Sequence, residues 1–493
     1  MNSQASQAAP YGVILHFRRL DVSGVHPLFS GELAAAFAEL GMGIRIIEDY
    51  HDLAAVGAAM ADPDCRFFLC YNGFGSEIRL RDGGMSAYSA FGKPLIDFMH
   101  DCPANDAMQH QVASIFPERH LFLTDVSYLA VAREMGFANV RFVPSITFPG
   151  TIGDVPPWHD RPIEVLFPAG LPDPEIVLRR LRGVGGGSAD RLAKNLFDQA
   201  VARTSDWRVN PLAELRRACR DAGFPLDFSR ADSRFLFTAV ADFMHVSRRR
   251  ELLAAISHLP VTVMSDASLP AGPSALKIHP PGSISDVMRL MARSKAVLCP
   301  PAHPAGFHER ILGALGAGAL TIEASNSLMD ALFADGAETL LYENAAEAVL
   351  AIERVFAGDP QLPAIAARGR AIAAERYSPL RAAARFLGAV RKFHLGRPDR
   401  AAEFPGPGGL IVPPTVKVSG LHAVYDALAA SVPAKKSVAP AERDMAPAYS
   451  YMLLSQEYHA VKMLRIVRLA QFVKRGARLP RKIAAFLRKL IKA

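Results

Sequence analysis

The chain has 493 residues, more than a single hydrophobic core usually organises, which indicates two domains with additional segments. With 50% hydrophobic and 21% charged residues, its composition excludes a disordered chain. The apolar runs fall short of the roughly 20 residues that a membrane-spanning helix needs, and residues 1–10 lack the pattern of a signal peptide. We therefore expect a cytoplasmic protein, with its five scattered cysteines as buried free thiols.

The formal net charge of +8 is concentrated near the C-terminus. Residues 461–493 contain eleven Lys or Arg and no Asp or Glu, so the rest of the chain carries a net charge of about −3. The main body therefore lacks the basic character that is typical of nucleic-acid-binding proteins.

Residues 1–150 alternate short apolar runs with amphipathic stretches. The expected strands are 13–17, 44–47, 67–71, 94–98, 121–123 and 140–143. The stretch 29–40 has helical periodicity and ends at Gly41, a residue type that is common just after helices. Strands separated by helices predict a parallel sheet covered on both faces. We assign residues 1–150 to an N-terminal Rossmann-like domain.

A stretch rich in Pro, Gly and Asp, residues 148–162, predicts an interdomain linker. Residues 160–395 then form a predicted second Rossmann-like domain, with a long helical stretch over 174–259 and a closing helix over 377–393. Its expected strands are 163–167, 261–265, 276–279, 296–299, 320–323 and 339–342. Two doubly wound halves that face each other form a cleft, and ligands of such sheets bind at the carboxyl ends of the strands.

Residues 396–420 are again rich in Pro and Gly and predict a second linker, followed by a helical basic tail over 421–493. After Pro480, Ile483, Leu487 and Leu490 lie on one face of a predicted helix that carries Lys and Arg elsewhere. A basic amphipathic helix of this kind is typical of a protein that lies on an anionic membrane surface, here the inner face of the cell membrane. Docking on the protein's own body or on a partner is the alternative. Few aromatic residues accompany the charges, which disfavours nucleic acid.

Three polar side chains stand at the predicted start of a helix in the second domain. A buried strand ends at Cys299, a Pro/Gly loop follows, and the helix begins near His308. His308, Glu309 and Arg310 then lie in the first turn, where free N–H groups and the helix dipole favour a phosphate. Arg310 suits bidentate pairing with a diphosphate, and Glu309 suits hydrogen bonds from ribose or sugar hydroxyls. The alternative is that Glu309 only complements the helix dipole and Arg310 is a solvated surface charge.

The run 300–342 resembles the C-terminal domain of group-1-like glycosyltransferases related to the spore-maturation protein CgeB. The shared features are Gly306-Phe307-His308-Glu309-Arg310, the small-residue helix 313–319, Asn326, and Phe333 with Gly336. A looser similarity extends over roughly residues 10–395. It includes Asn72, Gly92-Lys93-Pro94-Leu95 and His100-Asp101-Cys102-Pro103.

The resemblance implies a GT-B fold, in which two Rossmann-like, doubly wound α/β domains face a cleft. It further implies a nucleotide-sugar donor bound mainly by the second domain and an acceptor that faces the first. We therefore expect a glycosyltransferase that moves a sugar to a glycan, lipid-linked or protein acceptor. The nucleotide sugar would be a co-substrate, and we expect no metal or other cofactor. A catalytically lapsed GT-B scaffold at the membrane surface and a GT-B nucleotide-sugar epimerase are the alternatives.

The expected donor-binding residues are Gly306, His308, Glu309, Arg310, Asn326 and His279. His279 ends a predicted strand and could pack on the donor base, although a plain loop histidine fits equally well. The expected catalytic residues are Asp101, His100 and Glu309. His100 and Asp101 follow the predicted strand 94–98 and should face the cleft, where either could act as a general base. A helix-capping Asp101 is the alternative, and His26, in the loop after the first strand, is a similar candidate.

The chain departs from its relatives at one position. Many retaining GT-B enzymes carry two glutamates separated by seven residues, but here Gly313 and Ala317 stand where the second is expected. Glu309 lies one turn before Gly313 on the same helix face and could substitute for it. The stereochemical outcome of transfer therefore stays open. Asp62-Pro63-Asp64 resembles an Asp-x-Asp metal motif but precedes a strand, so we predict a turn there and no metal.

Overall fold

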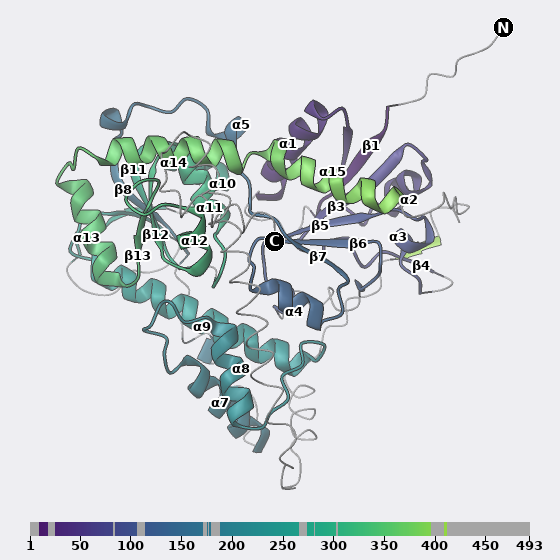
Figure 1. The fold of residues 1–493 in the computed structure, drawn as a ribbon, viewed down its shortest axis with the longest axis horizontal. Coiled ribbons are helices and arrows are strands. Elements are labelled where there is room, and N and C mark those ends of the chain that lie inside the picture. The colour runs from purple at the N-terminus through teal and green to yellow at the C-terminus, as the bar shows by residue number, and fades with distance from the viewer. Residues whose placement is uncertain are drawn as a thin grey trace, which may run out of the picture.

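The computed structural model contains two α/β domains and a set of helices that connects them (Figure 1). The described residues are 9–17, 25–81, 84–105, 114–170, 175, 177–178, 188–265, 274–280, 282–301, 304–395 and 409–411. The predicted linker 396–420, apart from 409–411, and the predicted tail 421–493 lie outside them. The membrane-surface prediction for residues 461–493 therefore stays a prediction. No helix in the described ranges has the length and apolar character that a bilayer crossing requires.

The first domain is a six-stranded parallel sheet in the order β2-β1-β3-β5-β6-β7. Its strands are β1 (Tyr11–Leu15), β2 (Gly43–Ile47), β3 (Cys65–Tyr71), β5 (Leu95–Met99), β6 (Arg119–Leu123) and β7 (Asn139–Phe142). Its helices are α1 (Val25–Glu39), α2 (Leu53–Ala61), α3 (Ala87–Ala90) and α4 (Tyr128–Glu134). The central strand β3 lies between β1 and β5 and is buried at every residue except Arg66, as its continuous apolar run requires.

The second domain is also a six-stranded parallel sheet, in the order β10-β9-β8-β11-β12-β13. Its strands are β8 (Ile163–Pro168), β9 (Thr262–Met264), β10 (Lys277–His279), β11 (Ser294–Cys299), β12 (Leu320–Ala324) and β13 (Leu340–Tyr342). Its helices are α10 (Ile284–Ala292), α11 (Glu309–Gly316), α12 (Ser327–Leu332), α13 (Ala345–Phe356) and α14 (Leu362–Arg376). The strand order reverses between β8 and β11, which opens a crevice at their carboxyl ends. The predicted pair of doubly wound α/β domains is confirmed.

In the described part of the chain, three long helices are inserted between β8 and β9 and lie below the two sheets in Figure 1. They are α7 (Ser188–Val201), α8 (Pro211–Asp221) and α9 (Ala231–Ile256). In its first half, α9 packs Phe237 and Met244 into a core shared with β6 and α4 of the first domain. In its last turns, Leu252 and Ile256 belong to the core of the second domain. Helix α9 therefore connects the two domains.

The chain crosses from the first domain to the second through α5 (Pro149–Ile152) and the 3₁₀ turn Trp158–Asp160, and it returns through α15 (Pro379–Leu395). The ring of Phe386 on α15 packs 5.4 Å from Phe98 and 4.8 Å from Phe122, centroid to centroid. Figure 1 shows α15 running beside α1. Residues 379–395, within the predicted second-domain range 160–395, thus pack on the first domain.

A short segment after α15 also returns to the first domain. Strand β14 (Leu410–Ile411) pairs antiparallel with β4 (Arg79–Leu80), and Leu410 is buried beside the first sheet. All five cysteines are buried and free, as predicted.

A fully buried ion pair connects β5 and β6 inside the first domain. The guanidinium of Arg119 donates two hydrogen bonds to the Oδ2 atom of Asp97, one of them from Nε at 3.1 Å. Oδ1 of Asp97 accepts from the backbone N–H of Gly73 at 2.8 Å. The pair therefore also holds the turn after β3, which leads into the cleft.

Asp97→Ala is expected to lower the free energy of unfolding by about 3–5 kcal/mol, because it removes the buried carboxylate that pairs with the guanidinium of Arg119. Denaturant unfolding, followed by circular dichroism, measures the effect. The control is Lys194→Gln, which breaks the exposed ion pair with Asp198 and should cost less than about 1 kcal/mol. Similar losses in both variants would contradict a special role for the buried pair.

Candidate functional site

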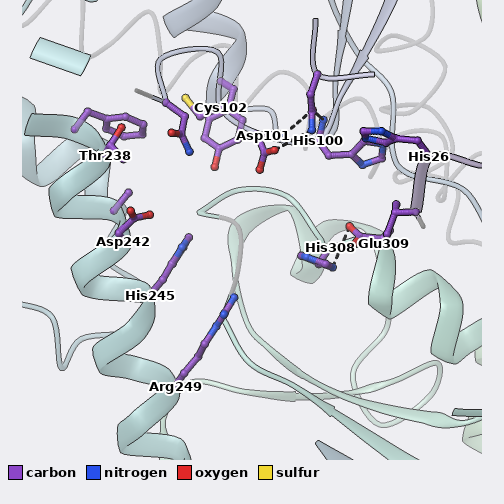
Figure 2. A pocket seen from close by; sticks show the side chains of 16 residues that line it. His26, His100, Asp101, Cys102, Thr238, Asp242, His245, Arg249, His308 and Glu309 are labelled. Atoms are coloured by element: carbon purple, nitrogen blue, oxygen red, sulfur yellow. Dashed lines mark hydrogen bonds and ion pairs between the residues drawn. The ribbon is translucent and has the colours of Figure 1, made fainter. Parts of the chain in front are cut away.

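A cavity of about 340 Å³ lies between the two domains. Its first-domain wall comes from the ends of β3 and β5, with Asn72, His100 and Asp101. The opposite wall comes from α9 and from the start of α11, with His308 and Glu309. Figure 2 shows these side chains pointing into the same space from three directions. The carboxyl ends of the first-domain strands therefore face the amino end of a second-domain helix, as expected for two doubly wound domains that face a cleft.

A second cavity, of about 220 Å³, lies in the second domain at the crevice where the strand order reverses. It is lined by residues 168–170 at the end of β8, by Met264 and Ser265 at the end of β9, by one side of α10, and by residues 308–310. His308 and Glu309 line both cavities. The two cavities therefore meet at the first turn of α11.

The first turn of α11 has the predicted position, because the helix begins at Glu309 and His308 caps it. The Nδ1 atom of His308 accepts from the backbone N–H of Arg310 at 3.2 Å and lies 3.0 Å from Oε2 of Glu309. Without a proton, Nδ1 accepts from the Arg310 N–H. With a proton, it would instead donate to the Glu309 carboxylate, so it serves only one of these partners at a time. Burial lowers the pKa of His308, which favours the neutral, accepting form.

Glu309 carries a negative charge at neutral pH. Burial acts to raise its pKa, but His308, His100 and Arg310 together hold the pKa well below its usual range. An ionised carboxylate at the junction of the two cavities can accept hydrogen bonds from ligand hydroxyl groups on either side.

The loop before α11 is fixed to the first domain by Asp125, which follows β6. Its Oδ2 atom accepts from the backbone N–H of Ala305 at 3.1 Å, and the Val126 N–H donates to the Ala305 carbonyl at 3.1 Å. Asp125 and Gly306 form an antiparallel β-bridge. A Cβ atom at Gly306 would lie 2.9 Å from the Asp125 Cα atom and from the Thr124 carbonyl oxygen. Only glycine allows the two backbones to approach this closely.

Three of the predicted donor-binding residues lie outside the linings of both cavities. The Asn326 amide donates to the Gly306 carbonyl at 3.0 Å, and its Oδ1 atom caps α12. Gly306 and Asn326 thus position the loop that leads to His308. His279, at the end of β10, has its Nδ1 atom 2.8 Å from the Pro280 carbonyl oxygen. For these three residues donor binding stays a prediction.

Asn72 orients the first-domain wall of the cavity. Its φ of +47° is the one positive value among the described residues other than glycine, and Asn tolerates this conformation better than most residues. Oδ1 of Asn72 accepts from the backbone N–H groups of His100 and Asp101, at 2.9 and 3.3 Å. Its Nδ2 atom donates to Oδ2 of Asp101 at 2.9 Å. The Asp101 carboxylate is thereby held in a defined direction within the cleft.

His100 and Asp101 differ in their electrostatic surroundings. Desolvation in the cleft, together with the charges of Glu309 and Asp242, raises the pKa of Asp101 to about 6. Burial lowers the pKa of His100 to about 4, and its Nε2 atom is buried without a hydrogen-bond partner. The His100 ring packs 4.6 Å from the Phe29 ring. His26 also lines the cavity and stacks on Tyr71 at 5.0 Å.

Helix α9 contributes four polar residues to the cavity that the sequence analysis did not single out. Thr238, Asp242, His245 and Arg249 follow one another at spacings of four, three and four, so they lie on one face of the helix. This polar stripe within a long helical stretch was the signal that could have identified them. Their position opposite Asp101 depends on how α9 packs (Figure 2).

The structure shows what occupies the positions where a second glutamate is expected. A Cβ atom at Gly313 would lie 2.8 Å from the Cε and Sδ atoms of Met288, so this methionine fills the space. Ala317 is fully buried. Glu309 is therefore the one carboxylate that α11 presents to the cavities. The described residues contain no cluster of three His, Cys, Asp or Glu side chains arranged for a metal ion.

Residues 248–388 match the family model described as glycosyl transferase-like. The match runs from the end of α9 into α15 and includes Arg249 and the first turn of α11. No curated protein sequence matches the chain. A specific relation to CgeB stays a prediction.

Several solved structures show a weak overall likeness to the chain. HepE of Anabaena in complex with UDP-glucose has 11% identity and a TM-score of 0.41, covering 77% of this chain and 99% of that one. Sucrose-phosphate synthase from Thermosynechococcus elongatus has 11% identity and a TM-score of 0.45, covering 79% and 100%. A glycosyltransferase from Rickettsia africae has 10% identity and a TM-score of 0.42, covering 79% and 100%. At these values the likenesses carry no weight for the function.

Gly306→Ala is expected to lower the free energy of unfolding by about 1–3 kcal/mol, because its methyl group would meet backbone atoms of the first domain. Denaturant unfolding measures the change. Gly31→Ala is the matched control, since an added Cβ there meets no atom within 4 Å and alanine favours the helix. An equal or smaller loss at Gly306 than at Gly31 would contradict the proposed interdomain constraint.

Proposed function

We propose that the chain is a glycosyltransferase that moves a sugar from a nucleotide-sugar donor to a hydroxyl group of a glycan, lipid-linked or protein acceptor, without a metal. The observation that carries this proposal is a pair of arginines, Arg249 in the lining of the larger cavity and Arg310 in that of the smaller, which are close enough to interact electrostatically. Neither forms an ion pair with a carboxylate in the described ranges, and Nε of Arg249 is buried without a partner. The glycosyl transferase-like match covers both residues.

Two neighbouring guanidinium groups, neither in a direct ion pair within the described ranges, are suited to a dianion. Burial, with the positive charge of Arg310 beside it, lowers the pKa of Arg249 to about 10, so Arg249 remains charged at neutral pH. The amino end of α11 adds the positive end of its helix dipole. The diphosphate of a nucleotide sugar meets this requirement, with its nucleoside part in the smaller cavity along 168–170 and 264–265.

In the proposed reaction, an acceptor hydroxyl in the larger cavity attacks the anomeric carbon of the donor sugar. Its proton passes to Asp101, the bond from the anomeric carbon to the diphosphate oxygen breaks, and the nucleoside diphosphate leaves with the electron pair. Arg249 and Arg310 stabilise the negative charge that develops on the leaving group. Glu309 orients the sugar or ribose through its hydroxyl groups. Direct attack of this kind inverts the anomeric centre.

Donor binding can be tested with UDP-glucose, UDP-N-acetylglucosamine, UDP-galactose, GDP-mannose and dTDP-glucose. At least one is expected to raise the melting temperature of the full chain, since a ligand that binds the folded state stabilises it. Arg310→Met and Arg249→Met should each weaken its affinity about tenfold or more. Arg289→Met is the control, because this exposed arginine on α10 lines neither cavity. A panel without any thermal shift would overturn the proposed function.

The pH dependence of transfer tests the role of Asp101. Asp101 must be deprotonated to accept a proton, and its pKa is raised to about 6, so the rate should decline as the pH falls through about 6. Asp101→Asn should reduce transfer by roughly 10²–10⁴-fold while keeping the thermal shift by the donor. Initial rates of product formation against pH provide the measurement. Normal transfer by Asp101→Asn would exclude it as the base, and transfer lost together with donor binding would indicate a structural role.

A further inference from the structure

Helix α9 forms one wall of the larger cavity, although it belongs to neither Rossmann-like sheet. Thr238, Asp242 and His245 lie along this wall, with Arg249 one turn further on, toward His308 (Figure 2). Across the cavity are Asn72 and the general-base candidate Asp101. An acceptor that reaches Asp101 must therefore lie against α9.

Helix α9 is held firmly enough to define the shape of this wall. The side chain of Arg248, beside Arg249, donates to the backbone carbonyls of Thr204, Asp206 and Val209, at 3.1, 2.9 and 2.9 Å. The indole N–H of Trp207 donates to Glu251 at 3.0 Å. These contacts lie outside the cavity, so they fix the helix and leave its polar stripe facing the cleft.

The chemistry of the lining selects among acceptors. Carboxylates enter from three different elements, with Asp101 after β5, Asp242 on α9 and Glu309 on α11. They disfavour an anionic acceptor such as a sugar phosphate. The same lining holds Arg249 and the imidazoles of His26 and His245, whose positive or potentially positive groups also disfavour a cationic acceptor. Carboxylate, amide and hydroxyl groups around a small space are suited to the many hydroxyl groups of a neutral sugar.

The size of the cavity agrees with a small ligand. Its volume of about 340 Å³ is near the lower end of the roughly 300–1,000 Å³ range of ligand pockets. It has room for a terminal sugar unit, but a long glycan would have to extend out of the cleft.

We propose that α9 is the acceptor-recognition element, and that Asp242 selects a neutral, hydroxyl-rich sugar unit by accepting hydrogen bonds from its hydroxyl groups. Thr238 supports the same contact from the preceding turn. Arg249 lies on the same face at the donor side, so one helix face connects the two substrates. This inference rests on the proposed function and adds the acceptor class to it.

The test uses the full chain with the donor's nucleoside diphosphate, UDP being the first choice. Binding of methyl α-glucoside, methyl β-galactoside and methyl α-mannoside is measured by saturation-transfer NMR, beside glucosamine and glucose 6-phosphate. At least one neutral glycoside should bind more tightly than both charged sugars. Asp242→Asn should weaken its binding about tenfold, because the amide keeps one acceptor oxygen and loses the charge. The thermal shift by the donor should remain unchanged.

Glu251→Gln is the matched control, because it removes a carboxylate from the same helix outside the cavity and should leave glycoside binding unchanged. If Asp242→Asn does not fold, Thr238→Val provides a second variant with the same expected direction. Absence of glycoside binding, preference for a charged sugar, or an equal loss in Glu251→Gln would overturn the inference. If the donor still shifts the melting temperature in that case, the proposed function stands. If neither donor nor glycoside binds, the proposed function fails as well.

Discussion

The contact between Asp125 and residues 305–306 fixes the geometry of the cleft. Asp125 follows β6 in the first domain, and its partners immediately precede the first turn of α11 in the second. The bridge involves backbone atoms, and Gly306 leaves no room for a side chain, so the separation of the two domains here has little freedom. The placement of His308 and Glu309 relative to Asp101 depends on this contact.

The residues of the cleft are arranged for a ligand more than for stability. Asp101, Asp242 and Glu309 share one cavity, and Arg249 lies near Arg310 without a direct ion pair to any described carboxylate. Like charges in a partly desolvated space destabilise the empty protein and are common at functional sites. Beneath the cleft, the Asp97–Arg119 pair and the amide of Asn72 hold the first-domain strand ends in place.

Helices α9 and α15 both connect the domains, but they do so differently. Helix α15 places Phe386 on the outer layer of the first sheet, away from the cavities. Helix α9 passes along the cleft and contributes side chains to it. A change in the angle between the domains would therefore alter the α9 wall of the larger cavity and the position of Arg249 together. Under the proposed function, binding of the donor and of the acceptor would then be energetically linked through one rigid helix.

The order of strands and helices was predictable from the sequence, because hydrophobic periodicity and strand–helix alternation are local signals. The start of α11 was equally predictable, since a strand, a Pro/Gly loop and a capping residue adjoin one another in the chain. The set of polar residues that share the cavity could not be predicted from the sequence. Asp242 and Arg249 lie some sixty residues before Glu309, and only the packing of α9 against both domains brings them opposite Asp101. Likewise, tertiary structure alone decided that Gly306 and Asn326 hold the loop and that Met288 occupies the space beside Gly313, because close approach between distant segments leaves no periodic trace in the sequence.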